Sequence, residues 1–454
     1  MADEKNIELI RGDPKKAIVK LSIPIMASMI LVMIYNIADS IWVAGIGPEA
    51  LAAIGFITPL FLLLVGLGGG IGAGANSLIS RYIGAKDSKQ ANNAALHAVF
   101  LCIVISAVFT VLMILLLPSL LIMIGAGDSL EYALEYGYII FAALFIFVYS
   151  NVASAIFRSE GDMRRATIAI AITAVLNAIL DPIFIYVLNF GITGAAWATV
   201  FSAILSCLVM SYWIWGKKDL FLDLSLKNFS FDKQIIIDIL LVAIPATLET
   251  IIFSALAIII NGMLVIVAGT TAVAVYTASM RIVQLAMIPL IGIGTAVITV
   301  AGVAYGARNV ENLKTAHSYS IKLSFLLSVI IGVIMVVFSN QIASIFSYTT
   351  SSSVLAPHIA TALSVLSLFV LAIPHGMMSS MLFQGVGKGI NSLILTLLRS
   401  LIFESIFAYL FAFIFGWGLV GIYAGVVLGC FVGSTVGFIW AKIFIKRFGE
   451  NLHS

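Results

Sequence analysis

Long apolar runs, separated by short polar segments, fill the chain from residue 17 to residue 443. A helix needs about 20 apolar residues to cross the hydrocarbon core of a bilayer, which is about 30 Å thick. Runs that are apolar on every face are typical of membrane spans, because a surface helix of a soluble protein keeps one polar face. The pattern predicts an all-α polytopic membrane protein with twelve transmembrane helices, at 17–41, 50–80, 91–117, 132–157, 164–188, 192–215, 235–262, 271–303, 313–338, 355–383, 390–415 and 419–443.

Positive charge alternates between the connections of these spans. Lys and Arg lie at the two ends of the chain and in the connections that follow even-numbered spans. The connection 118–131, which follows an odd-numbered span, carries only Asp128 and Glu131. Cytoplasmic connections of membrane proteins carry an excess of Lys and Arg. We therefore expect a multi-pass protein of the cell membrane with both termini in the cytoplasm.

The two halves of the chain resemble each other. The longest internal polar stretch, 216–234, separates six spans from six and predicts a cytoplasmic linker between lobes 1–215 and 235–454. Short motifs recur about half a chain apart: Ile23-Pro24 and Ile244-Pro245, Tyr82-Ile83-Gly84-Ala85 and Tyr305-Gly306-Ala307, Phe157-x-x-x-Gly161 and Phe383-x-x-x-Gly387, Gly191-x-x-Gly194 and Gly418-x-x-Gly421. Since six is an even number of spans, both halves enter from the same side. The repeats are then parallel, related by a pseudo-two-fold axis along the membrane normal.

Composition agrees with a membrane protein and excludes several functions. Hydrophobic residues make up 62% of the chain and charged residues only 10%, against roughly 25% in soluble domains. A net charge of +3 gives no sign of nucleic-acid binding, and the three cysteines lie in apolar runs without metal-ligand spacing. No enzyme motif is present. Gly66, Gly70 and Gly74 recur every four residues, which indicates helix packing rather than a phosphate loop.

Ionisable residues within spans carry the strongest functional signal, because burying them in hydrocarbon is costly. By helix rise, Asp39 lies about 33 Å along span 1 and Asp181 about 26 Å along span 5. Asn36 and Asn177 share a helix face with these carboxylates. Thr199 lies at similar depth in span 6, and Tyr35 lies one turn below Asp39.

These groups predict a cation site. Carboxylate, amide and hydroxyl oxygens are hard ligands that suit Na⁺, and two nearby carboxylates can instead share a proton. Pro182 disfavours helical geometry at Asp181, which would free a backbone carbonyl. The alternative, in which both aspartates only brace or cap helices, stays open at this point.

Other charged groups are expected to be structural. Glu249, Arg281, Arg399 and Glu404 balance in sign, and we expect ion pairs among them. The loop 160–165 carries both acidic and basic residues, which is typical of a surface exposed to water. Ile260 occupies the position that corresponds to Asp39 in the second half, so a site built on Asp39 belongs to the first half alone.

Several motifs together give the chain a family resemblance. They are the span from Pro24 to Asp39, Arg81-Tyr82-Ile83-Gly84-Ala85, Phe157-Arg158-Ser159-Glu160-Gly161-Asp162, Asn177-Ala178-Ile179-Leu180-Asp181-Pro182, and Gly191-x-x-Gly194-Ala195-Ala196-Trp197-Ala198-Thr199. With these motifs the chain resembles the multidrug and toxic compound extrusion (MATE) family over essentially its full length. It looks closest to the DNA-damage-inducible-F-type branch and to its archaeal members.

The resemblance implies a V-shaped, monomeric secondary transporter of two six-helix lobes, without a cofactor. It would export amphipathic, often cationic, drug-like compounds by alternating access, in exchange for H⁺ or Na⁺. The residues implied for H⁺ or Na⁺ binding are Asp39, Asn177, Asp181 and Thr199. Those implied for substrate binding are Tyr35, Asn36, Asp39, Asn177, Asp181 and Thr199. Pro24, where span 1 would bend, and Glu160, in a closing cytoplasmic loop, are implied in gating.

Two functions of other classes remain as alternatives. A flippase for lipid-linked oligosaccharides, from the same wider superfamily, would need a cationic cavity to meet pyrophosphate, whereas this chain buries acids. A polytopic membrane enzyme would need a catalytic cluster at a membrane face, and the sequence shows none. The physiological substrate and the choice between H⁺ and Na⁺ stay open.

Overall fold

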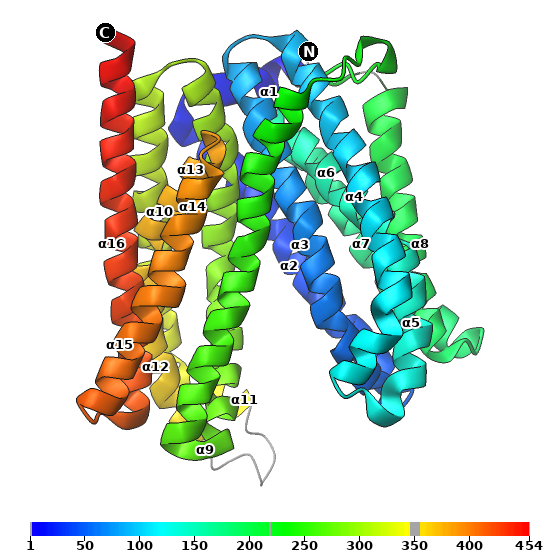
Figure 1. The fold of residues 1–454 in the computed structure, drawn as a ribbon, viewed down its shortest axis with the longest axis vertical. Helices are drawn as coiled ribbons and strands as arrows, with labels where there is room; N and C mark the ends of the chain where they lie inside the picture. The colour runs from blue at the N-terminus through cyan, green and yellow to red at the C-terminus, as the bar shows by residue number, and fades with distance from the viewer. Residues whose placement is uncertain (1, 218, 346–354, 454) are drawn as a thin grey trace. The chain divides into compact units, whose positions relative to one another are not determined.

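The computed structural model describes residues 2–217, 219–345 and 355–453 (Figure 1). Within these ranges the chain is helical and forms no strand. The α-helices are α1 (Ala2–Arg11), α2 (Pro14–Ala44), α3 (Pro48–Gly84), α4 (Ser88–Met123), α5 (Leu130–Ala142), α6 (Leu144–Ser159), α7 (Met163–Pro182), α8 (Gly191–Ser211), α9 (Lys233–Gly306), α10 (Val310–Val337), α11 (Ser339–Ile345), α12 (Ala356–Ala372), α13 (Pro374–Gly385), α14 (Gly389–Thr396), α15 (Ser405–Tyr409) and α16 (Gly418–His453).

Short helices of other geometry extend or join these elements. The 3₁₀ turns are η1 (Gly127–Ser129) and η4 (Leu226–Asn228). The π-helices are η2 (Ile183–Val187), η3 (Tyr212–Gly216), η6 (Leu397–Glu404) and η7 (Leu410–Ile414).

The described helices provide the predicted number of spans. Nine are long and apolar enough to cross a membrane, and two bent pairs add one span each: η1–α5 with α6, bent by 47°, and α12 with α13, bent by 43°. The 74 residues of α9 would measure about 110 Å if straight, several times the hydrocarbon thickness. Its helical geometry breaks at Ala268 and Gly269, where Gly269 takes a φ of 74°, so α9 contributes two spans. The twelve-helix prediction is confirmed.

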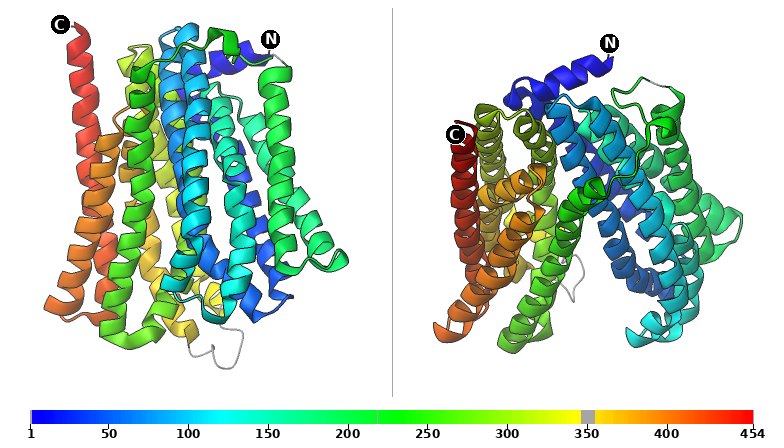
Figure 2. Two further views of the ribbon diagram at one scale, coloured as in Figure 1. Left: turned by 45° about the vertical axis from the view of Figure 1, so that its right-hand side comes forward. Right: turned by 45° about the horizontal axis from the view of Figure 1, so that its top comes forward.

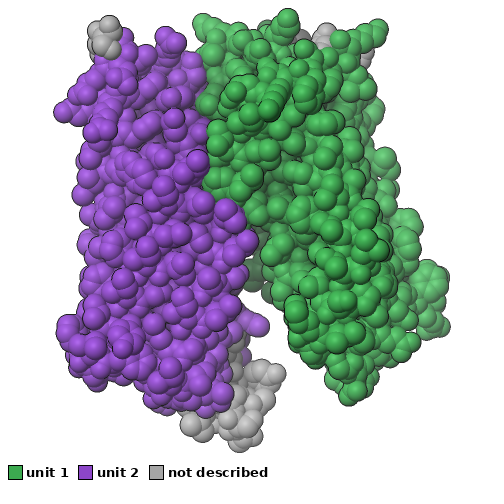
Figure 3. Space-filling view, viewed as in Figure 1, with its two compact units in different colours: residues 1–12, 23–247 green, residues 13–22, 248–454 purple. Residues whose placement is uncertain are grey.

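The chain forms two compact units (Figure 3). Unit 1 comprises Met1–Gly12 and Ile23–Thr247, and unit 2 comprises Asp13–Ser22 and Leu248–Ser454. The chain passes from one unit to the other three times, once between α1 and α2 and twice inside helices, in α2 and in α9. The boundaries predicted from the sequence, at 215 and 235, remain predictions about how the chain divides into lobes.

The connections predicted to be cytoplasmic gather at one end of unit 1. The helix α1 lies across this end (Figure 2), and its Arg11 donates from Nη2 to the carbonyl of Ile83 at 2.7 Å, at the C-terminal end of α3. Asn93 near the start of α4 donates from Nδ2 to the carbonyl of Ser230 at 2.9 Å, in the segment before α9. His97 accepts a hydrogen bond at Nε2 from the Asp232 backbone N–H at 2.9 Å. The polar linker is therefore fixed to α4 over its second half.

In unit 2, α16 packs closely along the span that runs from α14 to η7 (Figure 2). Glycines recur on α16 every four residues, and a Cβ at most of them would strike the facing backbone: Gly421, Gly425, Gly429 and Gly433. A side chain at Gly429, for example, would come within 2.5 Å of the Glu404 Cα atom. Small residues at this spacing let two membrane helices approach to backbone contact.

The sequence repeat is visible in backbone detail. The π-helices Ile183–Val187 and Leu410–Ile414 have the same length and lie 227 positions apart. Gly191 and Gly418, also 227 positions apart, both take a φ of 57°. Gly161 and Gly387, 226 positions apart, both take a φ of 80°. The two bent spans also occupy corresponding places in the two units. The two units therefore share these breaks and bends at corresponding positions.

Candidate functional site

The candidate site lies inside unit 1, and α7 provides its buried part. Asn177 and Asp181 are one turn apart on α7 and are 1% and 0% exposed. The Asn177 Nδ2 atom donates to Asp181 Oδ1 and to Thr199 Oγ1 of α8, both at 3.2 Å. Thr199 in turn donates to the carbonyl of Ala195 at 3.1 Å. The amide thus fixes a carboxylate and a hydroxyl from two helices in one place.

The side chain of Asp39, on α2, lies next to these residues of α7 and α8. Its carboxyl lies within hydrogen-bonding range of the Asp181 carboxyl. Within the described residues, no N–H or hydroxyl donates to Asp39 Oδ1 or to Asp181 Oδ2, and Asn177 Oδ1 also lacks a partner. Two carboxylates in contact repel each other, and a proton shared between them, or a cation bound to both, converts repulsion into attraction.

The site therefore has the chemistry of a cation receptor. Two carboxyls, an amide oxygen and a threonine hydroxyl supply oxygen atoms of the kind that hard cations prefer. A proton needs only the carboxyl pair, whereas Na⁺ would also engage the Asn177 and Thr199 oxygens. The described residues contain no group of three or more His, Cys, Asp or Glu side chains that would hold a more highly charged metal.

Aromatic residues border the carboxyl pair. Tyr35 lies one turn before Asp39 on α2, within electrostatic range of both aspartates. Tyr136 of α5 is 8% exposed, lies within the same range, and is within hydrogen-bonding reach of Thr199. Tyr136 is not predicted from the sequence, because nothing there distinguishes it from the neighbouring Tyr132 and Tyr138 until the fold brings α5 against the site.

One predicted site residue lies apart from this cluster. The Asn36 side chain is exposed, and its backbone carbonyl accepts a hydrogen bond from Ser40 at 2.8 Å. Of the substrate-binding set predicted from the sequence, the structure brings together Tyr35, Asp39, Asn177, Asp181 and Thr199, but not the Asn36 side chain.

Pro24 lies inside α2, which continues through it without a break. A proline has no N–H, so the carbonyl one turn earlier loses its helical partner. The Pro24 carbonyl itself accepts a hydrogen bond from Thr167 of α7 at 3.0 Å. This contact links the proline region of α2 directly to the helix that carries Asp181.

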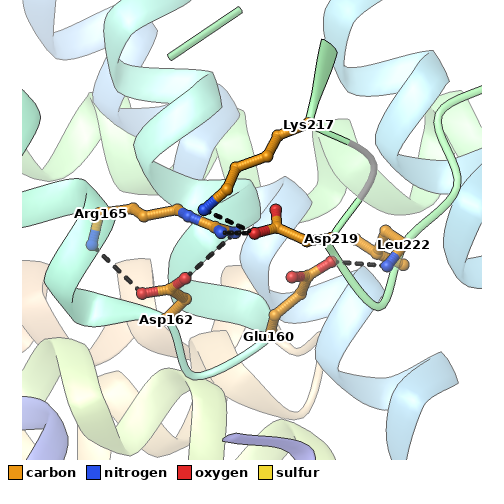
Figure 4. A network of polar contacts seen from close by, with 6 residues as sticks. All are labelled: Glu160, Asp162, Arg165, Lys217, Asp219 and Leu222. Atoms are coloured by element: carbon orange, nitrogen blue, oxygen red, sulfur yellow. Dashed lines mark hydrogen bonds and ion pairs between the residues drawn. The ribbon is translucent and has the colours of Figure 1, made fainter. Parts of the chain in front are cut away.

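Glu160, the second residue predicted to act in gating, is buried at the C-terminal end of α6 (Figure 4). It is 2% exposed, and its Oε1 atom accepts a hydrogen bond from the backbone N–H of Leu222 at 2.7 Å. The expectation that the loop 160–165 is a solvated face is therefore wrong for Glu160. A buried carboxylate needs donors, and the linker backbone supplies one.

An ion cluster next to Glu160 fixes the start of the linker (Figure 4). Asp219 Oδ2 lies 2.6 Å from Arg165 Nη2 and 2.9 Å from Lys217 Nζ, and Arg165 also pairs with Asp162 at 3.4 Å. Partial burial acts to raise the pKa of the Asp219 carboxyl. The hydrogen bond from Lys217 and the positive charges of Arg165 and Lys217 outweigh that effect, so the pKa of Asp219 lies below its ordinary value.

The charged residues of unit 2 do not form the expected ion pairs. Arg281 is exposed, and none of the ion pairs among the described residues involves it, Glu249, Arg399 or Glu404. Glu249 instead accepts at Oε1 from Ser392 Oγ at 2.6 Å and from Gln384 Nε2 at 3.3 Å. The basic side chain that interacts electrostatically with Glu249 is Arg399 rather than Arg281. Neutral donors on neighbouring helices thus satisfy this carboxylate.

Comparison with known proteins identifies relatives over most of the chain. The MatE family model matches residues 24–183 and 245–410. The "Probable multidrug resistance protein NorM" of Thermotoga maritima is 26% identical over 73% of this chain and 72% of its own.

Solved structures resemble it more closely still. A crystal structure of a MATE in complex with MaL6 superposes with a TM-score of 0.95 at 41% identity, covering 98% of this chain and 99% of the other. A transporter of the MOP superfamily from Pyrococcus furiosus, whose binding pocket is described as having reverse polarity, superposes with a TM-score of 0.94 at 41% identity and 98% coverage of both chains.

Proposed function

The chain belongs to the MatE family of membrane transporters, and we propose that it exports amphipathic, cationic compounds across the cell membrane in exchange for H⁺ or Na⁺. The observation that carries this proposal is the contact between Asp39 and Asp181 inside unit 1. The name of the NorM relative supports multidrug compounds as the substrate class. The protein would act as a monomer with both termini in the cytoplasm, and its place in the DNA-damage-inducible-F-type branch remains a prediction.

Competition for negative charge explains how exchange would work. When the carboxyl pair holds a proton or Na⁺, its charge falls and a cationic substrate loses its attraction to the site. When the ion leaves to the cytoplasm, the pair regains its charge, and a lipophilic cation binds between the carboxylates and the rings of Tyr35 and Tyr136. Each ligand changes the affinity of the other by the same factor, which is the thermodynamic requirement for antiport.

The alternative function, transport of lipid-linked oligosaccharides, is disfavoured by charge. Such lipids carry pyrophosphate, an anion, and the buried groups of the site are carboxyls with no basic side chain among them. A pocket of this polarity would repel pyrophosphate rather than bind it.

Transport in reconstituted vesicles tests the proposal. Purified protein in liposomes loaded with a fluorescent lipophilic cation should release the dye when a pH gradient or a Na⁺ gradient is imposed, and the effective gradient identifies the coupling ion. A dye of the same size with negative charge serves as the control. Export of the anionic dye, or export that no ion gradient changes, would contradict the proposed antiport.

A further inference from the structure

Unit 2 carries one residue more than unit 1 in the span that bears Glu404. The offset between the repeats is 226 at the start of this span, from Gly161 to Gly387, and 227 at its end, from Ile183 to Leu410. In unit 1 the corresponding helix, α7, has regular α geometry up to Pro182. In unit 2 the span contains the π-helix η6. A π-helix bonds residue i to i+5, which accommodates one extra residue, and π-turns are frequent at functional sites.

The π-helix holds two buried ionisable side chains. Arg399 is 3% and Glu404 1% exposed. They are five positions apart, so the π-helical hydrogen-bonding pattern places them on the same side. The close approach of α16 fixes both, because a Cβ at Gly433 or at Gly429 would come within 2.5 Å of the Cα atoms of Arg399 and Glu404 respectively. The backbone of η6 is therefore held against α16 at both positions.

Neither side chain is fully satisfied. The Glu404 Oε2 atom and the Arg399 Nη1 atom are buried without a hydrogen-bond partner among the described residues. Arg399 reaches Ser400 Oγ through Nε at 3.4 Å, and Ser400 also lies within hydrogen-bonding reach of Glu404. Glu249, by contrast, has donors for both of its oxygens. Glu404 is thus the carboxyl of this core with one oxygen, Oε2, that no donor reaches among the described residues.

The buried charges of this core do not balance when every group is ionised. A guanidinium stays protonated in proteins, so Arg399 contributes one positive charge. With Glu249 and Glu404 both ionised, the three groups would carry one excess negative charge in a region shielded from water. The other titratable groups near Glu404, Tyr276 of α9 and Cys430 of α16, supply no positive charge. Uncompensated buried charge is strongly unfavourable, and a carboxyl in this position takes up a proton instead.

We propose that Glu404 binds a proton, and that unit 2 thereby has a proton-binding site of its own besides the carboxyl pair of unit 1. A proton fits better than Na⁺, because one carboxyl oxygen suffices to hold it, whereas Na⁺ needs several oxygen ligands. The internal repeat also supports the choice of Glu404. With the offset of 227, Glu404 corresponds to Asn177, so unit 2 places an acid where unit 1 places the amide of its candidate site.

Infrared spectroscopy of the purified protein tests this proposal directly. At neutral pH the wild-type protein should show the carbonyl stretch of one protonated carboxyl that is absent from the Glu404→Gln variant. The matched control is Glu160→Gln, which removes a buried, hydrogen-bonded carboxylate of unit 1 that has no part in this charge count, and it should leave that band in place. Replacing K⁺ by Na⁺ at constant pH should not change the band. The infrared band does not depend on export, so the experiment tests the proton site of unit 2 separately from the proposed antiport.

Three results would overturn the assignment. The first is a difference spectrum in which Glu404→Gln removes no protonated carboxyl. The second is loss of the band on addition of Na⁺, which would make the site a sodium site. The third is failure of Glu404→Gln to fold, because glutamine has nearly the shape of a neutral glutamic acid and a protonated site should tolerate it.

Discussion

Asn177 is the residue on which the geometry of the unit 1 site depends, since one amide group donates to both Asp181 and Thr199. A hydrogen bond donated to a carboxylate favours its charged form. In the Asn177→Ala variant the carboxyl pair should hold its proton more tightly, and the affinity for a lipophilic cation at neutral pH should fall by about tenfold or more, the effect of losing a hydrogen bond to a charged group.

Titration of the purified protein with a fluorescent cation measures this change. Asn36→Ala is the matched control, because it removes the same group from an exposed position of α2. If both variants lose the same affinity, or neither does, the amide bridge has no part in cation binding.

Asp219 provides a prediction about pH. Its pKa is lowered in the folded protein, so its ion pairs stabilise the fold above the ordinary carboxyl pKa, and this contribution is lost as the pH falls through the lowered value. The side chain is 34% exposed, so at pH 7 Asp219→Asn should reduce the free energy of unfolding by only about 0.5 kcal/mol. Thermal unfolding of both proteins should show a small difference at pH 7 that vanishes in acid. A difference that persists unchanged at low pH would rule out the ion pairs as its cause.

At the scale of the element, α2 is expected to bend at Pro24. The missing N–H weakens the helix there, and the hydrogen bond from Thr167 to the Pro24 carbonyl joins the bend to α7. Pro24→Ala restores the helical hydrogen bond and should slow vesicle export by about tenfold or more, a barrier increase of about 1.4 kcal/mol, while cation affinity is unchanged. Pro59→Ala in α3, which also removes a proline from inside a helix, is the control. Full export by Pro24→Ala would show that α2 need not bend.

The glycine face of α16 makes a prediction about stability. A Cβ at Gly425 would strike the backbone at Ala408, whereas one at Gly262 of α9 would meet nothing within 4 Å. Gly425→Ala should therefore destabilise the protein by about 1–3 kcal/mol through overpacking, and Gly262→Ala should not. Thermal unfolding in detergent compares the two. Equal stability of both variants would mean that α16 is free to move away from its neighbour.

At the scale of the whole molecule, the sequence predicted the twelve spans and the repeat because bilayer thickness and charge asymmetry restrict them strongly. Helix rise alone also placed Asp39, Asp181 and Thr199 at similar depth, and the fold brings them together. The π-helix that carries Arg399 and Glu404 was not predicted, because a run that is apolar on all sides has no periodicity to reveal an inserted residue. For the same reason the ion pairs expected in unit 2 were wrong, since the sequence does not show which face of a helix a charge occupies.

Competition between a cationic substrate and a proton for the Asp39–Asp181 pair is the central step of the proposed exchange. The most direct test adds a lipophilic cation to the purified protein in weakly buffered solution and measures the protons released. Wild-type protein should release protons as the cation binds, and its affinity should fall by up to about tenfold for each unit of decreasing pH. Asp39→Asn and Asp181→Asn should bind without this release, whereas Glu404→Gln should retain it. Cation binding by the wild-type protein with no proton release and no dependence on pH or Na⁺ would contradict the proposed competition.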